Sequence, residues 1–93
     1  MPAWIYILKL RSNGLYIGCT RDRMRRYKEH FSGTGCRTTI IDTPIAVVYE
    51  EEFNTYREAS IRERQIKRWS RAKKEALIRG DMKTLHQLAR RRH

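Results

Sequence analysis

The sequence is poor in cysteine, and this limits both its covalent chemistry and its cellular location. Its 93 residues contain two cysteines, Cys19 and Cys36. One disulfide is possible, but nothing else is typical of a secreted protein, so we expect free thiols in a reducing cytoplasm. A structural zinc site needs about four ligands at suitable spacing. Two cysteines and three scattered histidines do not supply that pattern.

Long apolar runs are also missing, and none approaches the length that crosses a bilayer. The first residues, Met1-Pro2-Ala3-Trp4, lead straight into a strand-like segment. They lack the basic region and apolar stretch of a signal peptide. We therefore predict a cytoplasmic protein that does not contact membranes.

Acidic side chains are outnumbered, with 10 aspartates and glutamates against 21 lysines and arginines, a formal net charge of +11. Such an excess suggests a polyanionic partner, and nucleic acid is the leading candidate. The alternative is a basic but otherwise ordinary surface. The length allows one domain with a modest core. With 40% hydrophobic and 33% charged residues, the composition fits a folded soluble protein.

Apolar periodicity and turn signals predict three strands and four helices. The predicted strands are Trp4–Leu10, Leu15–Cys19 and Ile45–Phe53, and the predicted helices are Arg21–Phe31, Tyr56–Trp69, Arg71–Arg79 and Asp81–Leu88. Residues 36–44 are expected to form an irregular loop. Up to residue 80 the order of elements is β-β-α-β-α-α, which predicts an α+β fold, a small three-stranded antiparallel sheet flanked by helices. We assign residues 1–80 to the domain and 81–93 to a short C-terminal helix with a basic tail.

Local signals add detail to this outline. Met24, Tyr27 and Phe31 recur at helical spacing and are expected to form the buried stripe of the first helix. The acidic run 50–52 is expected to end the third strand, at the edge or rim of the sheet. The predicted helix caps are Thr20 or Asp22, Asn54 or Thr55, Ser70, and the terminating Gly80.

The turn between the first two strands decides whether Tyr6 and Tyr16 lie on one face of the sheet. A two-residue Asn-Gly turn would pair Ser12 with Leu15 and place the tyrosines on opposite faces. A three-residue loop, with its glycine left-handed at a bulge, would pair Arg11 with Leu15. Both tyrosines then share a face, because side chains alternate along a strand. We predict the three-residue loop.

Arg26 and His30 are four residues apart on the first predicted helix, so they share one face. Arg23 lies on the same side, and Tyr27 lies at its border. A cation and an imidazole beside the sheet could bind a phosphodiester. The alternative is a solvated basic helix face.

Glu63 falls on the same helical stripe as Tyr56, Ala59 and Ile66. A partly desolvated carboxylate needs a partner or a metal ion. One carboxylate with waters and phosphate oxygens suits Mg²⁺, which keeps much of its hydration. The alternative is an ion pair with an arginine at the rim of the core.

The segment 67–74 is a basic run around Trp69. Its cations could neutralise phosphates, and the indole could stack on a base. For Trp69 we favour packing between two helices instead. The residues expected to bind the nucleic-acid backbone are Arg23, Lys67, Arg68, Arg71, Lys73 and Lys74.

The pattern of these residues resembles the signature of the GIY-YIG nucleases. Ile5-Tyr6-Ile7 and Tyr16-Ile17-Gly18 are similar to its two halves, Arg26 lies eight residues beyond Gly18, and His30 lies four beyond Arg26. Glu63 matches the metal-binding glutamate of the family. The resemblance covers about residues 4–77, and it is closest to small stand-alone bacterial members.

The resemblance implies hydrolysis of phosphodiester bonds with one divalent ion, Mg²⁺ or Mn²⁺, held by Glu63. It implies that Arg26 stabilises charge on the phosphoryl oxygens, and that Tyr16 activates water with help from His30 while Tyr6 orients the site. A phenol with an ordinary pKa near 10 is a poor base, so Tyr16 needs cationic neighbours. Nucleic acid is the implied partner, with DNA favoured over RNA and little sequence specificity.

The sequence departs from the family pattern in two places. Trp4 stands where the first motif has glycine, and both asparagines, Asn13 and Asn54, precede Glu63, whereas many active members have an asparagine after it. The alternative function is therefore a non-catalytic nucleic-acid-binding module with the same fold. A protein-binding adaptor is a third possibility.

Overall fold

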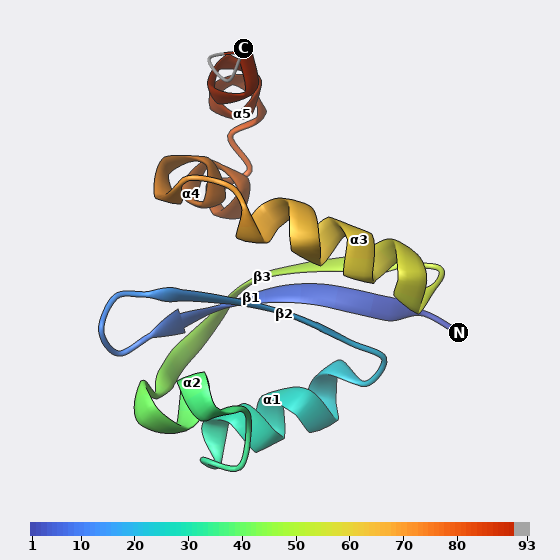
Figure 1. The fold of residues 1–93 in the computed structure, drawn as a ribbon, viewed down its shortest axis with the longest axis vertical. Coiled ribbons are helices and arrows are strands. Elements are labelled where there is room, and N and C mark those ends of the chain that lie inside the picture. The colour runs from blue at the N-terminus through green and yellow to red at the C-terminus, as the bar shows by residue number, and fades with distance from the viewer. Residues whose placement is uncertain (91–93) are drawn as a thin grey trace.

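A computed structural model describes residues 1–90 and shows a three-stranded antiparallel sheet with helices on both faces (Figure 1). The strands are β1 (Ala3–Leu10), β2 (Leu15–Thr20) and β3 (Pro44–Phe53). Their order in the sheet is β2-β1-β3, so β1 is central. The predicted α+β class and small antiparallel sheet are confirmed.

Within residues 1–90 the structure has five helices. They are α1 (Arg23–Phe31), α2 (Arg37–Ile41), α3 (Tyr56–Lys67), α4 (Arg71–Arg79) and α5 (Met82–Arg90). Figure 1 shows α1 and α2 on one side of the sheet and α3 on the other, with α4 and α5 extending beyond α3. No helix of the described part of the chain is long and apolar enough to cross a bilayer.

The β1–β2 hairpin has the predicted three-residue loop, but its register is shifted by one pair. Leu10 N–H donates to the carbonyl of Gly14 at 2.9 Å, and Asn13 N–H donates to the carbonyl of Leu10 at 2.9 Å. The left-handed residue is Asn13, with φ of 78°, so the prediction of a left-handed Gly14 and of an Arg11–Leu15 pair is wrong. Asparagine tolerates this conformation. The loop lies one residue earlier than predicted, so the partner of each strand residue changes by two positions, and the same residues still share a face.

Alternation along β1 creates two cores, one on each face of the sheet. Ala3, Ile5 and Ile7 point toward α3 and are fully buried. The other buried members of this larger core are Ile17, Ala59, Ile66, Ala76, Leu77 and Leu85. Tyr6, Leu8 and Leu10 point toward α1 and α2 and form the smaller core. Tyr16, Tyr27 and Val47 are partly buried and pack against it, so half of the residues of this smaller core are aromatic.

The buried face of α1 differs from the predicted one. Met24 is 70% exposed and Phe31 is 44% exposed, whereas His30 is fully buried and Tyr27 partly so. Apolar periodicity therefore identifies the wrong stripe. The reason is that α1 packs against the tyrosine-containing face of the sheet, where hydrogen bonds make the burial of an imidazole favourable.

Two further predictions are corrected. The segment expected to be an irregular loop contains the short helix α2. The acidic run Glu50–Glu52 does not end its strand: it lies within β3 and pairs with Trp4–Tyr6 of β1. Its predicted place at an edge is right, because β3 is an edge strand and its outer side chains can remain solvated.

The helix boundaries after the sheet follow local capping signals closely. The side chains of Thr55 and Ser70 accept hydrogen bonds from the backbone N–H groups of Glu58 and Lys73. Gly80 ends α4 in the left-handed conformation. α3 ends at Lys67, two residues before its predicted end, and α5 extends past its predicted end to Arg90. The rest of the predicted basic tail, residues 91–93, lies outside the described residues.

Gly18 allows Tyr6 to lie flat against β2. The two residues are partners in the β1–β2 register. A Cβ atom on residue 18 would lie 2.8 Å from Cε1 of Tyr6 and closer still to its Cζ and hydroxyl oxygen. Tyr6 is 1% exposed and held by a hydrogen bond to His30, so its ring has little freedom to move aside.

We expect Gly18→Ala to lower the free energy of unfolding by about 1–3 kcal/mol, the usual cost of overpacking a core. Urea denaturation measures the change. The same substitution in a Tyr6→Leu background should cost much less, because the clashing ring is gone. An equal cost in both backgrounds would place the origin of the effect elsewhere than at Tyr6.

Candidate active site

Tyrosines from neighbouring strands meet on the face of the sheet that α1 covers. Tyr6 of β1 and Tyr16 of β2 lie on the same face, with ring centroids 6.4 Å apart. Tyr27 of α1 packs edge-on against Tyr6 at 5.3 Å between centroids. Tyr6 is almost fully buried, whereas Tyr16 is partly exposed. Tyr16 is thus the more accessible phenol of the two strand residues.

His30 connects the sheet to both helices of this layer. Its Nε2 lies 2.8 Å from the hydroxyl of Tyr6, and its Nδ1 lies 2.8 Å from Oγ1 of Thr39 in α2. Oγ1 of Thr39 in turn donates to the carbonyl of Cys36 at 3.1 Å. Because the threonine proton is used there, Thr39 accepts from Nδ1–H, and Nε2 accepts from the Tyr6 hydroxyl. The imidazole is therefore neutral, with its proton on Nδ1.

Gly35 provides the space for this hydrogen-bonded chain. A Cβ atom at position 35 would lie 2.6 Å from Nδ1 of His30 and 2.8 Å from Oγ1 of Thr39. Any side chain there would push the helices α1 and α2 apart. Gly18 and Gly35 thus flank the chain from opposite ends, one beside Tyr6 and one beside Thr39.

Burial sets the protonation states of these groups. Burial raises the pKa of Tyr6 to about 12, although neighbouring Arg26 lowers it. Burial also raises the pKa of Tyr16, and its contact with Cys36 raises it further. For His30, burial and the nearby charge of Arg26 lower the pKa, which Glu29 only partly opposes. At neutral pH both phenols keep their protons and the imidazole is uncharged.

Arg26 supplies positive charge to this cluster of tyrosines and histidine. Its side chain is 30% exposed, and one of its nitrogens, Nη1, lies 3.0 Å from Oε1 of Glu29. Although partial burial disfavours its charged form, interactions with Glu29 and Tyr6 raise the pKa of the guanidinium above its ordinary range. Arg26 in turn lowers the pKa of Tyr6 and Tyr16. One partly exposed cation therefore acts on both phenols.

Cys36 is a site residue that sequence reasoning did not identify, since it was expected to be a loop residue. Despite burial, interactions with Tyr16, Thr39 and Thr38 lower the pKa of its thiol to about 7. Thr39 was likewise left without a role, although it holds His30. Both residues lie in the segment around α2, and the Gly-Cys-x-x-Thr spacing becomes informative only once that segment is helical.

Glu63 lies on α3, the helix that covers the opposite face of the sheet from α1. Its side chain is 19% exposed, and Oε2 lies 3.3 Å from Nζ of Lys67. Its charge contributes to raising the pKa of Cys19 on the edge strand β2, of Tyr56, and of Tyr6. Glu63 therefore lies near β2. Within residues 1–90 its recorded ion pair is with Lys67, not with Arg26.

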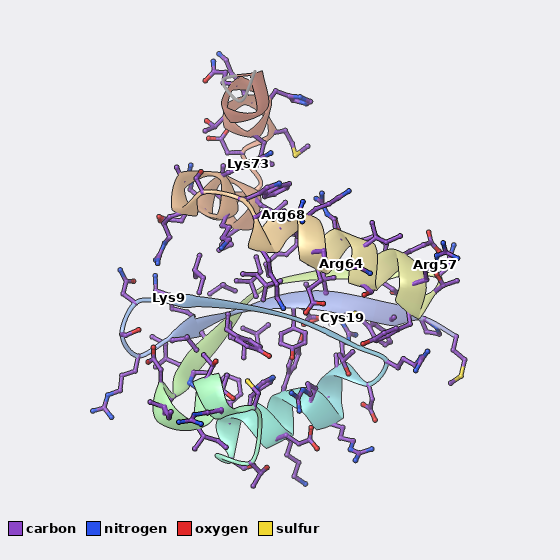
Figure 2. The ribbon with its side chains drawn as sticks, in the orientation of Figure 1. Lys9, Cys19, Arg57, Arg64, Arg68 and Lys73 are labelled. Carbon is purple, nitrogen blue, oxygen red and sulfur yellow. The ribbon has the colours of Figure 1, made fainter. Side chains whose placement is uncertain are left out.

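The cations predicted to bind nucleic acid are distributed around α3 and α4, with Arg23 on α1. Arg23 pairs with Glu50 and also lies over the ring of Trp4. Arg71 lies 3.5 Å from Glu75, and Arg68 lines a hollow on α3 together with Arg64. Figure 2 labels Arg64, Arg68 and Lys73 along these helices.

Trp69 packs against the larger core between α3 and α4, as we favoured from the sequence. Nζ of Lys73 lies 4.1 Å from the centroid of its ring, and the guanidinium of Arg62 lies 5.1 Å from it. Lys73 is only 9% exposed. This lysine therefore interacts with the indole inside the protein, while Lys74, its partly buried neighbour, has more access to solvent.

Four of the five residues predicted to form the site meet on one face of the sheet, namely Tyr6, Tyr16, Arg26 and His30. Glu63 approaches from the other face, by the edge strand. No group of three or more histidine, cysteine, aspartate or glutamate side chains in the described part of the chain could enclose a metal ion. The pocket offers a cation and hydroxyl donors, which suit the oxygens of a phosphate.

Comparison with known proteins identifies the family of this arrangement. A sequence model of the GIY-YIG catalytic domain matches residues 2–76. The UPF0213 protein of Staphylococcus saprophyticus is 43% identical over 75 residues, which are 81% of this chain and 92% of the relative. A UPF0213 protein of Natronomonas pharaonis is 40% identical over 75 residues, 81% of this chain and 88% of the relative.

A solved structure is similar as well. The solution NMR structure of a UPF0213 protein from Bacillus halodurans has 37% sequence identity and a TM-score of 0.56, and the match covers 84% of this chain and 83% of that chain. The names of these relatives state no activity. The signature tyrosines lie together beside Arg26 and His30, and the family model spans the whole sheet. This chain therefore belongs to the GIY-YIG family, a nuclease superfamily whose substrates are nucleic acids.

Proposed function

We propose that the protein is a metal-dependent endonuclease that hydrolyses nucleic-acid phosphodiester bonds with little sequence specificity. The observation that supports this most strongly is the joint position of Tyr6, Tyr16 and His30 beside the guanidinium of Arg26. A partly exposed cation next to phenolic donors suits a phosphodiester.

Arg26 is the residue proposed to stabilise the transition state. Charge accumulates on the non-bridging oxygens of a phosphate under attack, and a fixed cation lowers the energy of that state more than that of the substrate. The ion pair with Glu29 at 3.0 Å fixes the guanidinium before substrate arrives. Arg26 is also 30% exposed, so a phosphate can reach it.

Tyr16 is proposed to activate the attacking water, because it is the more accessible of the two strand phenols. Its raised pKa makes the protonated phenol the resting form. Loss of that proton therefore requires added positive charge, from Arg26 or from a metal ion. His30 lies beside the Tyr16 ring, at 5.3 Å between centroids, and accepts a hydrogen bond from the Tyr6 hydroxyl. It thus fixes Tyr6, which orients the site.

Glu63 is proposed to hold a single divalent cation, Mg²⁺ or Mn²⁺. A carboxylate oxygen is a donor that these hard ions prefer, and Mg²⁺ commonly uses one or two carboxylates with waters and substrate phosphates. The single carboxylate fits an ion of this kind and does not fit a closed protein cage. Such an ion would supply Lewis-acid charge at the phosphate. Lys67, now 3.3 Å from Glu63, would have to yield that oxygen.

The excess of basic residues is proposed to hold the nucleic-acid backbone without reading base sequence. The formal net charge is +11, and exposed cations at the C-terminal end of α3 include Lys67 and the capping residue Arg68. We infer DNA as the substrate in preference to RNA. The cysteines Cys19 and Cys36 are both free thiols, which is compatible with action in the reducing cytoplasm.

A non-catalytic nucleic-acid-binding module is the second candidate. The observation in its favour is the state of Glu63, which pairs with Lys67 and comes from the helix on the other face of the sheet. Trp4 in place of a glycine, and the lack of an asparagine after Glu63, point the same way. In this case the residues around Arg26 would bind a backbone phosphate without hydrolysing the phosphodiester bond.

Nicking assays should separate the two candidates. The purified protein is incubated with supercoiled plasmid, branched DNA and RNA, in Mg²⁺, Mn²⁺ or EDTA. We expect metal-dependent nicking that Arg26→Ala and Glu63→Ala each reduce on the order of a hundredfold, the effect of removing one transition-state contact. Arg11→Ala and Glu52→Gln are matched controls, since both residues are exposed and neither belongs to the proposed site.

Three results would contradict the nuclease. Tight binding of nucleic acid with no nicking in any condition supports the binding module. Nicking that survives in both variants indicates a contaminant or a different site. Nicking in EDTA indicates that no divalent ion takes part.

The neutral state of His30 predicts a loss of stability on acidification. Because the folded pKa lies below the ordinary value near 6.5, the unfolded chain binds more protons just below that pH. Stability should be fully present above about pH 6.5 and should fall as the pH drops below it. The limiting slope for one proton is about 1.4 kcal/mol per pH unit.

Urea denaturation between pH 7.5 and 5.5 tests this expectation. His30→Gln should be less stable at pH 7.5 and should lose most of the pH dependence in this range. His86→Gln is the matched control, since His86 is exposed on α5, and it should keep the wild-type slope. A slope that persists in His30→Gln would assign the pH dependence to other groups.

A further inference from the structure

We propose that Tyr56 and Arg21 form a subsite for an unpaired nucleobase beside the candidate active site. The inference rests on the proposed function, since the base would belong to the nucleic acid whose phosphate Arg26 binds. It adds a second contact point, formed by residues outside the signature of the family. Its ligand is the flat face of a base rather than a phosphate.

Tyr56 is the first residue of α3 and is 38% exposed. It lies on the stripe of α3 that is buried at Ala59 and Ile66, yet its ring reaches past the edge of the core. Cζ of Arg21 lies 4.4 Å from the centroid of this ring. A guanidinium stacked on a phenol gives a flat, positively charged surface, onto which a base can stack without regard to its identity.

Arg21 connects this platform to the pocket around Arg26. Arg21, Arg25 and Arg26 line a hollow of about 240 Å³ together with Thr20, Asp22 and Glu29. Arg21 also lines a second hollow of about 450 Å³, with Thr55 and Tyr56. Since one side chain borders both hollows, a strand whose phosphate lies against Arg26 can place a neighbouring base against Tyr56.

The charges around the platform favour a polyanion. The recorded contact of Arg21 within residues 1–90 is the Tyr56 ring rather than a carboxylate. The side chain of Arg25 is 76% exposed, and its closest carboxylate contact, to Glu29, is long at 3.7 Å. Both cations can therefore turn to phosphates without breaking a strong ion pair.

The platform also lies near the carboxylate proposed to hold the metal ion. The charge of Cys19, partial burial and the charge of Glu63 together raise the pKa of Tyr56. The nucleic-acid strand would thus contact the Tyr56 platform, the Glu63 carboxylate and Arg26 with neighbouring nucleotides. A fully paired duplex keeps its bases stacked and offers no free base face to Tyr56. The subsite therefore favours nucleic acid with an unpaired nucleotide next to the bound phosphate.

Fluorescence of 2-aminopurine tests the subsite directly. The full-length protein is titrated, in EDTA to prevent cleavage, with a duplex that carries one unpaired 2-aminopurine and with a fully paired duplex of equal length. We expect the wild type to quench the unpaired base. Tyr56→Ala should abolish the quenching and weaken binding of this duplex about tenfold, while its affinity for the paired duplex changes less than twofold. Tyr56→Phe keeps the ring and should behave like the wild type.

Two matched controls accompany these variants. Phe31→Ala removes another exposed ring, on α1, and should change neither quenching nor affinity. Arg21→Ala should weaken binding of both duplexes and lower the slope of log affinity against log salt by about one phosphate contact. Arg11→Ala removes an equal charge from the hairpin loop and should change the slope less.

Quenching by Tyr56→Ala equal to that of the wild type would overturn the subsite, as would an equal loss of affinity for both duplexes. Failure of the wild type to quench or to bind would overturn it too. Because no metal is present, these results do not depend on cleavage. Nicking without quenching contradicts the subsite alone, whereas quenching without metal-dependent nicking contradicts the nuclease alone.

Discussion

The hydrogen bonds of His30 connect the sheet to the helices α1 and α2 that cover one of its faces. An imidazole that is fully buried is unfavourable unless its nitrogens have partners, and His30 finds them in Tyr6 of β1 and Thr39 of α2. Among the residues that the structure describes, the buried hydrophobic members of the smaller core on this face are Tyr6, Leu8 and Leu10. Hydrogen bonds therefore attach α1 and α2 to this face of the sheet, whereas aliphatic packing attaches α3 to the other face. The same bonds that dock α1 and α2 also fix Tyr6 of the site.

Local signals predict the parts of the fold that depend on neighbours in sequence. The caps at Thr55 and Ser70 and the left-handed end at Gly80 follow from residue chemistry within one helical turn. The shared face of Tyr6 and Tyr16 follows from the three-residue length of the hairpin loop, which the observed register keeps. The buried face of α1 could not be predicted in this way. His30 is buried because of partners 24 and 9 residues away, and no periodicity within α1 reports them.

The residues of the candidate site also differ in how well local signals predict them. Spacing and family resemblance were enough to name Tyr6, Tyr16, Arg26 and His30 together, because they lie on two strands and a helix with strong local signals. Cys36 and Thr39 were missed, because their position depends on α2, a five-residue helix within a polar segment. Glycines marked this region all the same: Gly18 and Gly35 stand where a Cβ would collide with Tyr6 and with His30. Close packing around the site therefore requires glycine at these two positions.

The protonation states of the site residues show why the proposed hydrolysis needs more than the groups around Arg26. Burial raises the pKa of both Tyr6 and Tyr16, so the resting pocket holds two phenols, a neutral imidazole and the charge of Arg26. Tyr16 and Arg26 can donate hydrogen bonds to a phosphate, whereas the protons of Tyr6 and His30 are used within the protein. None of these groups removes a proton from water readily at neutral pH. Deprotonation of Tyr16 needs a second positive charge close by. The carboxylate that could hold such a charge, Glu63, lies across β2 and is paired with Lys67. In the proposed mechanism, binding and hydrolysis therefore make separate demands on this chain. Arg26 and Tyr16 would contact the bound phosphate, whereas hydrolysis would require that Glu63 exchange its lysine for a cation that reaches that phosphate.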